Sequence, residues 1–195
     1  MKKTLALALT LAFALLTLPD SPACAAAEAR RIAILPVAAT VENRELPAVE
    51  AKVAATLAAW FRTPLPSFVK VYEIIPAAEI KAASPPDGIL DPRKPDLPRL
   101  RQLALKLDAD LILGVIVTDL GEYTVNNPWS GLQLKTDLAM RLVGYRADRG
   151  SFIDIKDRED YFDDWSARGE AANLAGALTE RLLTKAAGGR EFWPR

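Results

Sequence analysis

The spacing of hydrophobic residues predicts a strand followed by a helix at the start of the folded part of the chain. Residues 31–37 (RIAILPV) form an almost unbroken apolar run, which is typical of a strand buried on both faces. Over residues 46–61, apolar side chains recur every three or four positions, with Pro47 near the start and Pro64 just past the end. This spacing and these prolines predict a helix.

The middle of the chain predicts a second strand, two more helices and an irregular loop between them. Residues 68–75 (FVKVYEII) are rich in β-branched and aromatic side chains, as strands are, and a short helix is expected over residues 77–83. Five prolines or glycines interrupt residues 84–95, which indicates a surface loop. Asp96 then has the chemistry of an N-cap for an amphipathic helix over residues 97–107.

The last strands are predicted from two different patterns. Residues 109–120 (ADLILGVIVTDL) are the most apolar stretch after the N-terminal region and suit a central strand. Residues 132–142 alternate apolar and polar side chains, which predicts a strand with one buried face. After a polar turn at residues 146–150, residues 151–162 return as another strand, so that an antiparallel hairpin is expected.

A final helix completes the predicted order of elements. Ser166 is a candidate N-cap, the apolar positions after it recur with helical spacing, and Gly188 with Gly189 ends the helix. Helices and strands alternate early and the strands follow one another late. We therefore expect an α/β (α+β) fold, with a mixed five-stranded sheet that includes a C-terminal antiparallel hairpin and is packed by three to four helices.

The N-terminal region has the features of a secretory signal peptide. Lys2 and Lys3 precede an uncharged apolar run over residues 4–19, and small residues follow it. The run is shorter than the roughly 20 apolar residues that a transmembrane helix needs. We expect residues 1–27 to be removed and residues 28–195 to form one exported domain with a short flexible C-terminal tail.

Cys24, the only cysteine, lies in the expected cleavage region and leaves two interpretations open. Bacterial lipoproteins are cut just before a cysteine that then carries lipid, and Ala23 suits the residue before such a site. Ser21 and Pro22 do not fit the lipoprotein pattern, which favours ordinary removal of the leader. The expected location is the periplasm or cell envelope, with membrane attachment only if Cys24 is lipidated.

Composition excludes several classes of function. The chain has 25 basic and 25 acidic side chains, so no large basic field is available to bind nucleic acid. It has no histidine, which removes the usual general base near neutral pH and the commonest metal ligand. No glycine-rich phosphate loop, GxSxG sequence or GKS/GKT sequence is present, and we predict no cofactor, no metal and no catalytic residue.

Two groups of acidic residues are candidate sites, and both favour structural interpretations. The carboxylates of residues 154–164 have the oxygen chemistry that calcium prefers, but not the spacing of an EF-hand loop. We interpret them as the charges of a solvated edge strand, which protect it from aggregation. Asp108 and Asp110 are interpreted as a junction between a helix and a strand.

Aromatic side chains outside the predicted elements are the candidate partner-binding residues. Residues 123–131 (YTVNNPWSG) are expected to form a loop that carries Tyr123 and Trp129. Trp129 either anchors an interface or folds back over the edge of the sheet. The tail residues Phe192 and Trp193 present the same choice, docking onto the domain or onto another molecule.

Three segments together resemble a known family. The opening strand IAILP, the run LALKLDADLILGVIV and the hairpin closed by YRADRG, with the last amphipathic helix, are similar to the small α/β domain of envelope proteins. That family includes the TolB N-terminal domain and the curli-export lipoprotein CsgG. The resemblance implies an anticodon-binding-domain-like fold and a role in envelope binding, assembly or secretion without catalysis.

These observations lead to one main hypothesis and two alternatives. The main one is a non-enzymatic envelope protein that acts as a protein-interaction or assembly module, with another envelope protein or a second copy as its partner. The first alternative is a periplasmic domain that binds a small ligand or a cation through the Pro-rich loop or the acidic hairpin. The second is a hydrolase whose site has no recognised motif.

Overall fold

The protein has a mixed α/β fold, seen in a computed structural model that describes residues 29–62, 72–85, 88–129, 131–164 and 166–188. The expected signal peptide, Cys24, Phe192 and Trp193 therefore lie outside the described residues. The strands are β1 (Arg30–Ile34), β2 (Ala38–Ala39), β3 (Tyr72–Ile74), β4 (Leu111–Asn127), β5 (Gly131–Arg146) and β6 (Ser151–Asp164). The helices are α2 (Leu46–Trp60), α3 (Ala77–Ala83), α4 (Leu97–Leu107) and α5 (Ala171–Ala186), with a short 3-10 helix η1 (Ala167–Gly169).

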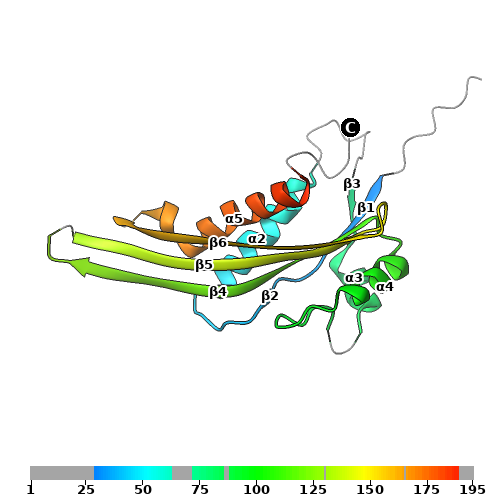
Figure 1. The fold of residues 1–195 in the computed structure, drawn as a ribbon, viewed down its shortest axis with the longest axis horizontal. Helices are drawn as coiled ribbons and strands as arrows, with labels where there is room; N and C mark the ends of the chain where they lie inside the picture. Colours follow the sequence, from blue (N-terminus) through cyan, green and yellow to red (C-terminus); the bar gives the residue numbers. More distant parts are fainter. Residues whose placement is uncertain (1–28, 63–71, 86–87, 130, 165, 189–195) are drawn as a thin grey trace, which may run out of the picture.

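All six strands belong to one sheet, in the order β3-β1-β4-β5-β6, with β2 beside β4. The short β1 is parallel to both β3 and β4. The long strands β4, β5 and β6 are antiparallel to one another, and the β4–β5 hairpin extends past the helices (Figure 1). Within the described part of the chain, no helix has the length and apolar character needed to cross a membrane.

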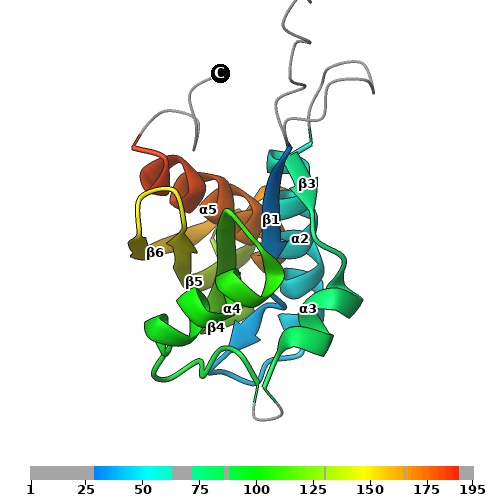
Figure 2. The ribbon, with the colours of Figure 1, turned by 90° about the vertical axis from the view of Figure 1, so that its right-hand side faces the viewer.

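Helices cover the two faces of this sheet unequally. Helices α2 and α5 pack side by side along one face, which we call the inner face (Figure 1). Helices α3 and α4 cover the opposite, outer face only at the end of the sheet near β1 (Figures 1 and 2). Two apolar cores result, one on each face. The inner core includes Val49, Val53 and Leu57 of α2 and Leu174, Leu178 and Leu182 of α5, and the outer core includes Leu100, Leu103 and Leu107 of α4.

Most of the predicted elements are confirmed. The buried stripes of α2 and α5 are those expected from helical spacing, and the alternation over residues 132–142 belongs to the paired strand β5. The side chain of Asp96 accepts a hydrogen bond from the Arg99 backbone N–H, as an N-cap does. The antiparallel hairpin of β5 and β6 is also present.

The structure differs from the prediction in the number of strands and at several element boundaries. The sheet has a sixth, two-residue strand, β2, which is too short to give a sequence pattern. Strand β3 is described over Tyr72–Ile74, and the first residues of the predicted strand, 68–71, lie outside the described part, so its predicted start stays a prediction. Helix α5 begins at Ala171 and not after Ser166, because the chain first makes the turn η1. The Ser166 hydroxyl contacts the Tyr161 hydroxyl at 2.9 Å and does not cap the helix.

Gly144 of β5 lies directly against the backbone of β4. A Cβ atom at this position would lie 2.4 Å from the backbone oxygen of Ile112 and 2.9 Å from the Leu113 side chain. Backbone cannot move aside without disturbing the β4–β5 ladder. At Gly121 of β4, by contrast, the nearest atom would be 3.9 Å away.

The substitution Gly144→Ala is therefore expected to lower the free energy of unfolding by about 1–3 kcal/mol, as overpacking in a well-filled core does. Gly121→Ala is the matched control and should change it by less than about 0.5 kcal/mol. Urea unfolding followed by circular dichroism measures both. Equal stability of the two variants would contradict the close approach at Gly144.

A network of ion pairs fixes α5 to the edge strand β6. Arg181 Nε and Lys185 Nζ each lie 2.6 Å from Asp157 Oδ2, and Arg181 Nη1 lies 2.6 Å from Glu159 Oε2. Burial alone would raise the pKa of Asp157, but hydrogen bonds from Lys185, Arg181 and the backbone N–H of Arg158 lower this pKa to about 2. The folded protein thus binds a proton at Asp157 less readily than the unfolded chain does.

The lowered pKa makes one part of the stability depend on pH. The Asp157 contribution is expected to be complete above about pH 4 and to be lost as the pH falls toward 2, because the unfolded chain takes up the proton first. At pH 7, Asp157→Asn should reduce the free energy of unfolding by about 1 kcal/mol, a modest value since both basic partners are partly exposed. Unfolding curves at several pH values should show the two proteins converging below pH 3. A constant difference would contradict the network.

Candidate interaction surface

A β-bulge in β4 decides which side chains of its second half face the helices. The register between β4 and β5 shifts between Val117 and Asp119. Before the shift, odd-numbered residues such as Val115 and Val117 point to the inner core, and after it the even-numbered Leu120 does. One extra residue, Thr118, therefore turns the rest of β4 over relative to its first half.

An inner row of three side chains, one from each long strand, holds the start of α5. Glu122, Thr136 and Tyr161 are neighbours across β4, β5 and β6. Glu122 Oε2 accepts a 2.6 Å hydrogen bond from the Ala171 backbone N–H, where the helix dipole favours a negative charge. The buried Thr136 hydroxyl donates a 2.7 Å hydrogen bond to the Gly169 backbone oxygen. Gly169 also lies against the Tyr161 ring, where a Cβ would not fit.

The neighbouring outer row points away from the helices. Tyr123, Lys135 and Phe162 are paired across the same three strands, one residue along from the inner row. Successive side chains of a strand lie on opposite faces, so this row is on the outer face. Tyr123 is 45% exposed and Phe162 is 60% exposed. Val125, on the same face of β4 as Tyr123, is 39% exposed.

Lys135 lies between the two aromatic rings without hiding them. Its Nζ atom is 5.4 Å from the centroid of the Tyr123 ring and 3.7 Å from Asp137 Oδ2. Hydrogen bonding to Tyr123, together with the charge of Asp137, raises the pKa of Lys135 above its usual value. The lysine therefore remains charged throughout the physiological range, and its charge is directed toward groups of its own sheet.

Trp129 lies at the tip of the β4–β5 hairpin. The Asn127 side chain accepts a 2.9 Å hydrogen bond from the Trp129 backbone N–H, and Gly131 closes the turn with a φ of +83°. Asn and Gly favour such turns because they form these local contacts and conformations at low cost. The Trp129 side chain is 95% exposed. We call Tyr123, Val125, Phe162 and Trp129 together the distal patch.

The structure corrects two expectations for this region and adds one residue. The segment predicted as a loop from Tyr123 is strand as far as Asn127, because β5 pairs with it along its whole length. The interpretation in which Trp129 folds back over the sheet edge is wrong, since this side chain is almost fully exposed. Phe162 was missed, although its position in the alternation of β6 already placed it on the face opposite Tyr161.

Charged side chains occupy the rest of the outer face and pair with one another. Arg141 forms two 2.7 Å hydrogen bonds with Asp154, and this contact lowers the pKa of the carboxyl. Arg158 Nε lies 2.7 Å from Asp160, and the guanidinium also lies within 4 Å of Asp119 and Asp137. These pairs satisfy their own charges, so the exposed apolar side chains of this face are those of the distal patch and, at the other end of the sheet, Phe152 beside Tyr145.

The acidic run of β6 is an edge-strand feature, as predicted. Strand β6 lies at the edge of the sheet, and its carboxylates at positions 154, 157, 159 and 160 contact arginine or lysine. Within the described ranges, no group of three or more potential metal-ligating side chains gathers. Asp108 ends α4 in the left-handed conformation, and Asp110 accepts a hydrogen bond from the Arg31 backbone N–H, so this pair is the expected junction.

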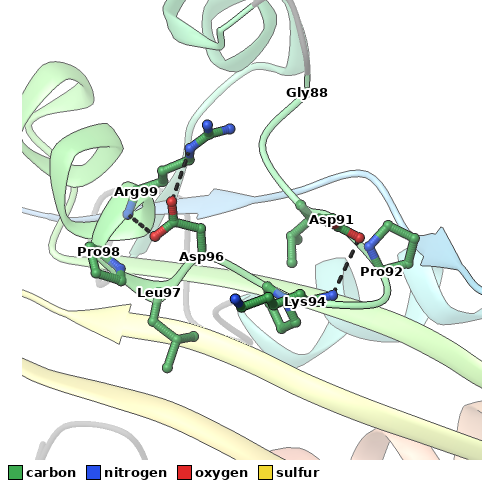
Figure 3. Close-up of a pocket in the computed structure, with 10 residues that line it drawn as sticks. Gly88, Asp91, Pro92, Lys94, Asp96, Leu97, Pro98 and Arg99 are labelled. Atoms are coloured by element: carbon green, nitrogen blue, oxygen red, sulfur yellow. Dashed lines mark hydrogen bonds and ion pairs between the residues drawn. The ribbon is translucent and has the colours of Figure 1, made fainter.

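The Pro-rich loop lines a hollow at the other end of the molecule. The hollow has a volume of about 920 Å³ and lies beside the start of α4 (Figure 3). Its two carboxylates already have partners: Asp91 accepts from the backbone N–H groups of Arg93 and Lys94 in the loop, and Asp96 contacts Arg99 in the first turn of α4. The walls are mostly exposed side chains, so the hollow lacks the enclosed polar groups of a typical small-ligand site.

Comparison with known proteins identifies neither a family nor a function. No family model matches the sequence, and no curated protein matches it. Among solved structures, the PelC dodecamer from Paraburkholderia phytofirmans is 14% identical, with a TM-score of 0.43 over 80% of this chain and 86% of that one. Lipoprotein GNA1162 from Neisseria meningitidis is 15% identical (TM-score 0.41, 82% and 99% covered). The LpoB C-terminal domain from Salmonella enterica is 10% identical (TM-score 0.35, 70% and 83% covered).

Proposed function

We propose that this protein is an exported, non-enzymatic component of the cell envelope that binds a protein partner through the distal patch. One observation carries the proposal. Three aromatic side chains, Tyr123, Phe162 and Trp129, are exposed on the far half of the long antiparallel sheet, which includes the tip of the β4–β5 hairpin. Such side chains are enriched at the centres of protein interfaces and are costly to leave in water.

The patch is also rigid, which favours binding. Tyr123, Val125 and Phe162 project from paired strands, and the inner row beneath them is tied to the start of α5 by Glu122 and Thr136. A partner would therefore not have to order the backbone of this surface when it binds. The surrounding charges are already paired with one another, so the partner would need few charged groups opposite them.

The sequence supports the location and the absence of catalysis in this proposal. The N-terminal leader has the features of an export signal, and the lack of histidine removes the commonest general base. The resemblance to the TolB N-terminal domain and CsgG family is part of the same proposal and agrees with a role in binding or assembly. Lipidation of Cys24 would place the domain on a membrane, and its absence would leave it in the periplasm.

A ligand-binding function at the Pro-rich loop is less well supported. The hollow there is large enough for a small molecule, but its carboxylates are engaged by the loop's own N–H groups and by Arg99. A ligand would have to displace these contacts and would remain largely exposed. The acidic hairpin likewise offers carboxylates that already contact basic side chains.

Replacing Trp129 by alanine is expected to weaken binding to the partner about tenfold or more, because an exposed tryptophan that becomes buried in an interface is a typical hot spot. The stability of the protein should change by less than about 0.5 kcal/mol, since the side chain buries little in the domain itself. A photo-cross-linking amino acid at position 123 or 162, introduced in the native envelope, would capture the partner for mass spectrometry, and the purified pair would then give the affinity.

Leu105→Ala is the matched control for this experiment. Leu105 is a 75% exposed apolar side chain on α4, at the opposite end of the molecule. It should change neither the affinity nor the cross-linking pattern. Equal losses for the Trp129 and Leu105 variants, or cross-linked products that are the same at position 105 as at position 123, would contradict a specific role of the distal patch.

A further inference from the structure

The two edges of the long antiparallel sheet are protected to different degrees. Edge strands expose backbone groups that can pair with another chain, and proteins usually guard them with charged side chains. Strand β6 is guarded in this way, with charged residues at more than half of its positions. The far end of β4, from Gly121 to Asn126 (GEYTVN), has one charged residue, Glu122.

Even that one charge is directed away from the edge. Glu122 Oε2 accepts the hydrogen bond from the Ala171 backbone N–H, so the carboxylate serves the start of α5. The other side chains of this segment are small, polar and uncharged, or belong to the distal patch. Nothing in the sequence of the segment therefore opposes pairing with a further strand.

The structure also shows where the open edge begins. Up to Leu120, residues 40–43 donate hydrogen bonds to backbone oxygens on the edge of β4 opposite β5. Thr40 donates to the oxygens of Val117 and Thr118, and Asn43 Nδ2 donates to the oxygen of Leu120 at 3.0 Å. From Gly121 to Asn126, no other strand among the described residues pairs with this edge. The open edge thus runs from the Asn43 contact to the tip of the hairpin.

We propose that a second copy of this chain occupies this edge, with β4 pairing antiparallel to β4 of the other copy about a twofold axis at Thr124. This inference goes beyond the proposed function, because the second copy would pair with the strand edge beside the distal patch and leave the patch itself uncovered. A twofold axis places the same segment on both sides, so the side chains that face one another across the axis must be compatible. With the axis at Thr124, Thr124 faces Thr124, Tyr123 faces Val125, and Glu122 faces Asn126. No like charges meet, and aromatic–β-branched and Thr–Thr pairs are favourable across strands.

The open edge of β4 is long enough for this pairing. In the antiparallel register, residues just past Asn126 of one copy lie beside residues just before Glu122 of the other. The turn with Trp129 in each copy would then lie next to the Thr40–Asn43 segment of the other, where the open edge ends. The outer faces of both sheets point the same way, so Tyr123 and Val125 of the two copies lie side by side on one exposed face.

The first experiment measures self-association of the purified mature protein by sedimentation velocity over a range of concentrations. We expect a dimer that shifts toward monomer with Thr124→Lys, because this change places two ammonium groups opposite each other at the twofold axis. Ala55→Lys adds the same charge at an exposed position of α2 and should leave the dimer intact. Circular dichroism confirms that both variants are folded.

The second experiment tests the register. In a Cys24→Ala background, Thr124→Cys should be joined to a second copy by a short bifunctional maleimide, and Lys156→Cys on the guarded edge β6 should not. Equal cross-linking at both positions would overturn the proposal, and so would a protein that stays monomeric at all concentrations. If such a monomer still yields a different cross-linked protein from position 123 in the envelope, the second-copy inference fails and the proposed function stands.

Discussion

The β-bulge at Thr118 is the constraint on which the surface of this protein depends. In its first half, β4 directs odd-numbered residues into the core beneath α2 and α5, and after the bulge it directs even-numbered ones there. Without the extra residue, Tyr123 and Val125 would face α5, and Glu122 would lie on the outer face. The bulge thus brings Glu122 to the helix N-terminus and, as a necessary consequence of the pleat, exposes Tyr123.

The sequence was sufficient to predict those helices and strands in which buried side chains recur at a regular spacing. The stripe of α5 and the alternation over residues 132–142 each bury one face against a core, so the periodicity is visible in the residues themselves. The end of β4 has no such signal. Residues 121–127 are paired with β5 but lie beyond most of the helical cover, and they lack the apolar character that marks a buried strand. Only the pairing with β5 across the hairpin makes them a strand.

The candidate surface could be predicted only in part, because only some of its residues have a local sequence signal. Trp129 could be identified from the sequence because it lies next to Asn127 and Pro128, where no helix or strand accounts for a large aromatic side chain. Phe162 could not be identified in this way, because the alternation of β6 does not say which of its two faces is exposed. That depends on the strands with which β6 pairs. Its exposure follows from the register that sets it beside Lys135 and Tyr123. Aromatic side chains brought together from three strands cannot be recognised from any one of them.

A sheet that continues past its own core requires a physical reason, because its far end buries little that would stabilise it. Here the inner row supplies local anchoring through the bonds of Glu122 to Ala171 and of Thr136 to Gly169. These contacts attach β4 and β5 to the start of α5 and to η1. The anchored end then presents an apolar outer face and one open edge, while charges guard the other edge. Such an asymmetry is difficult to explain by stability alone, and it follows directly if one edge is kept free for a partner strand.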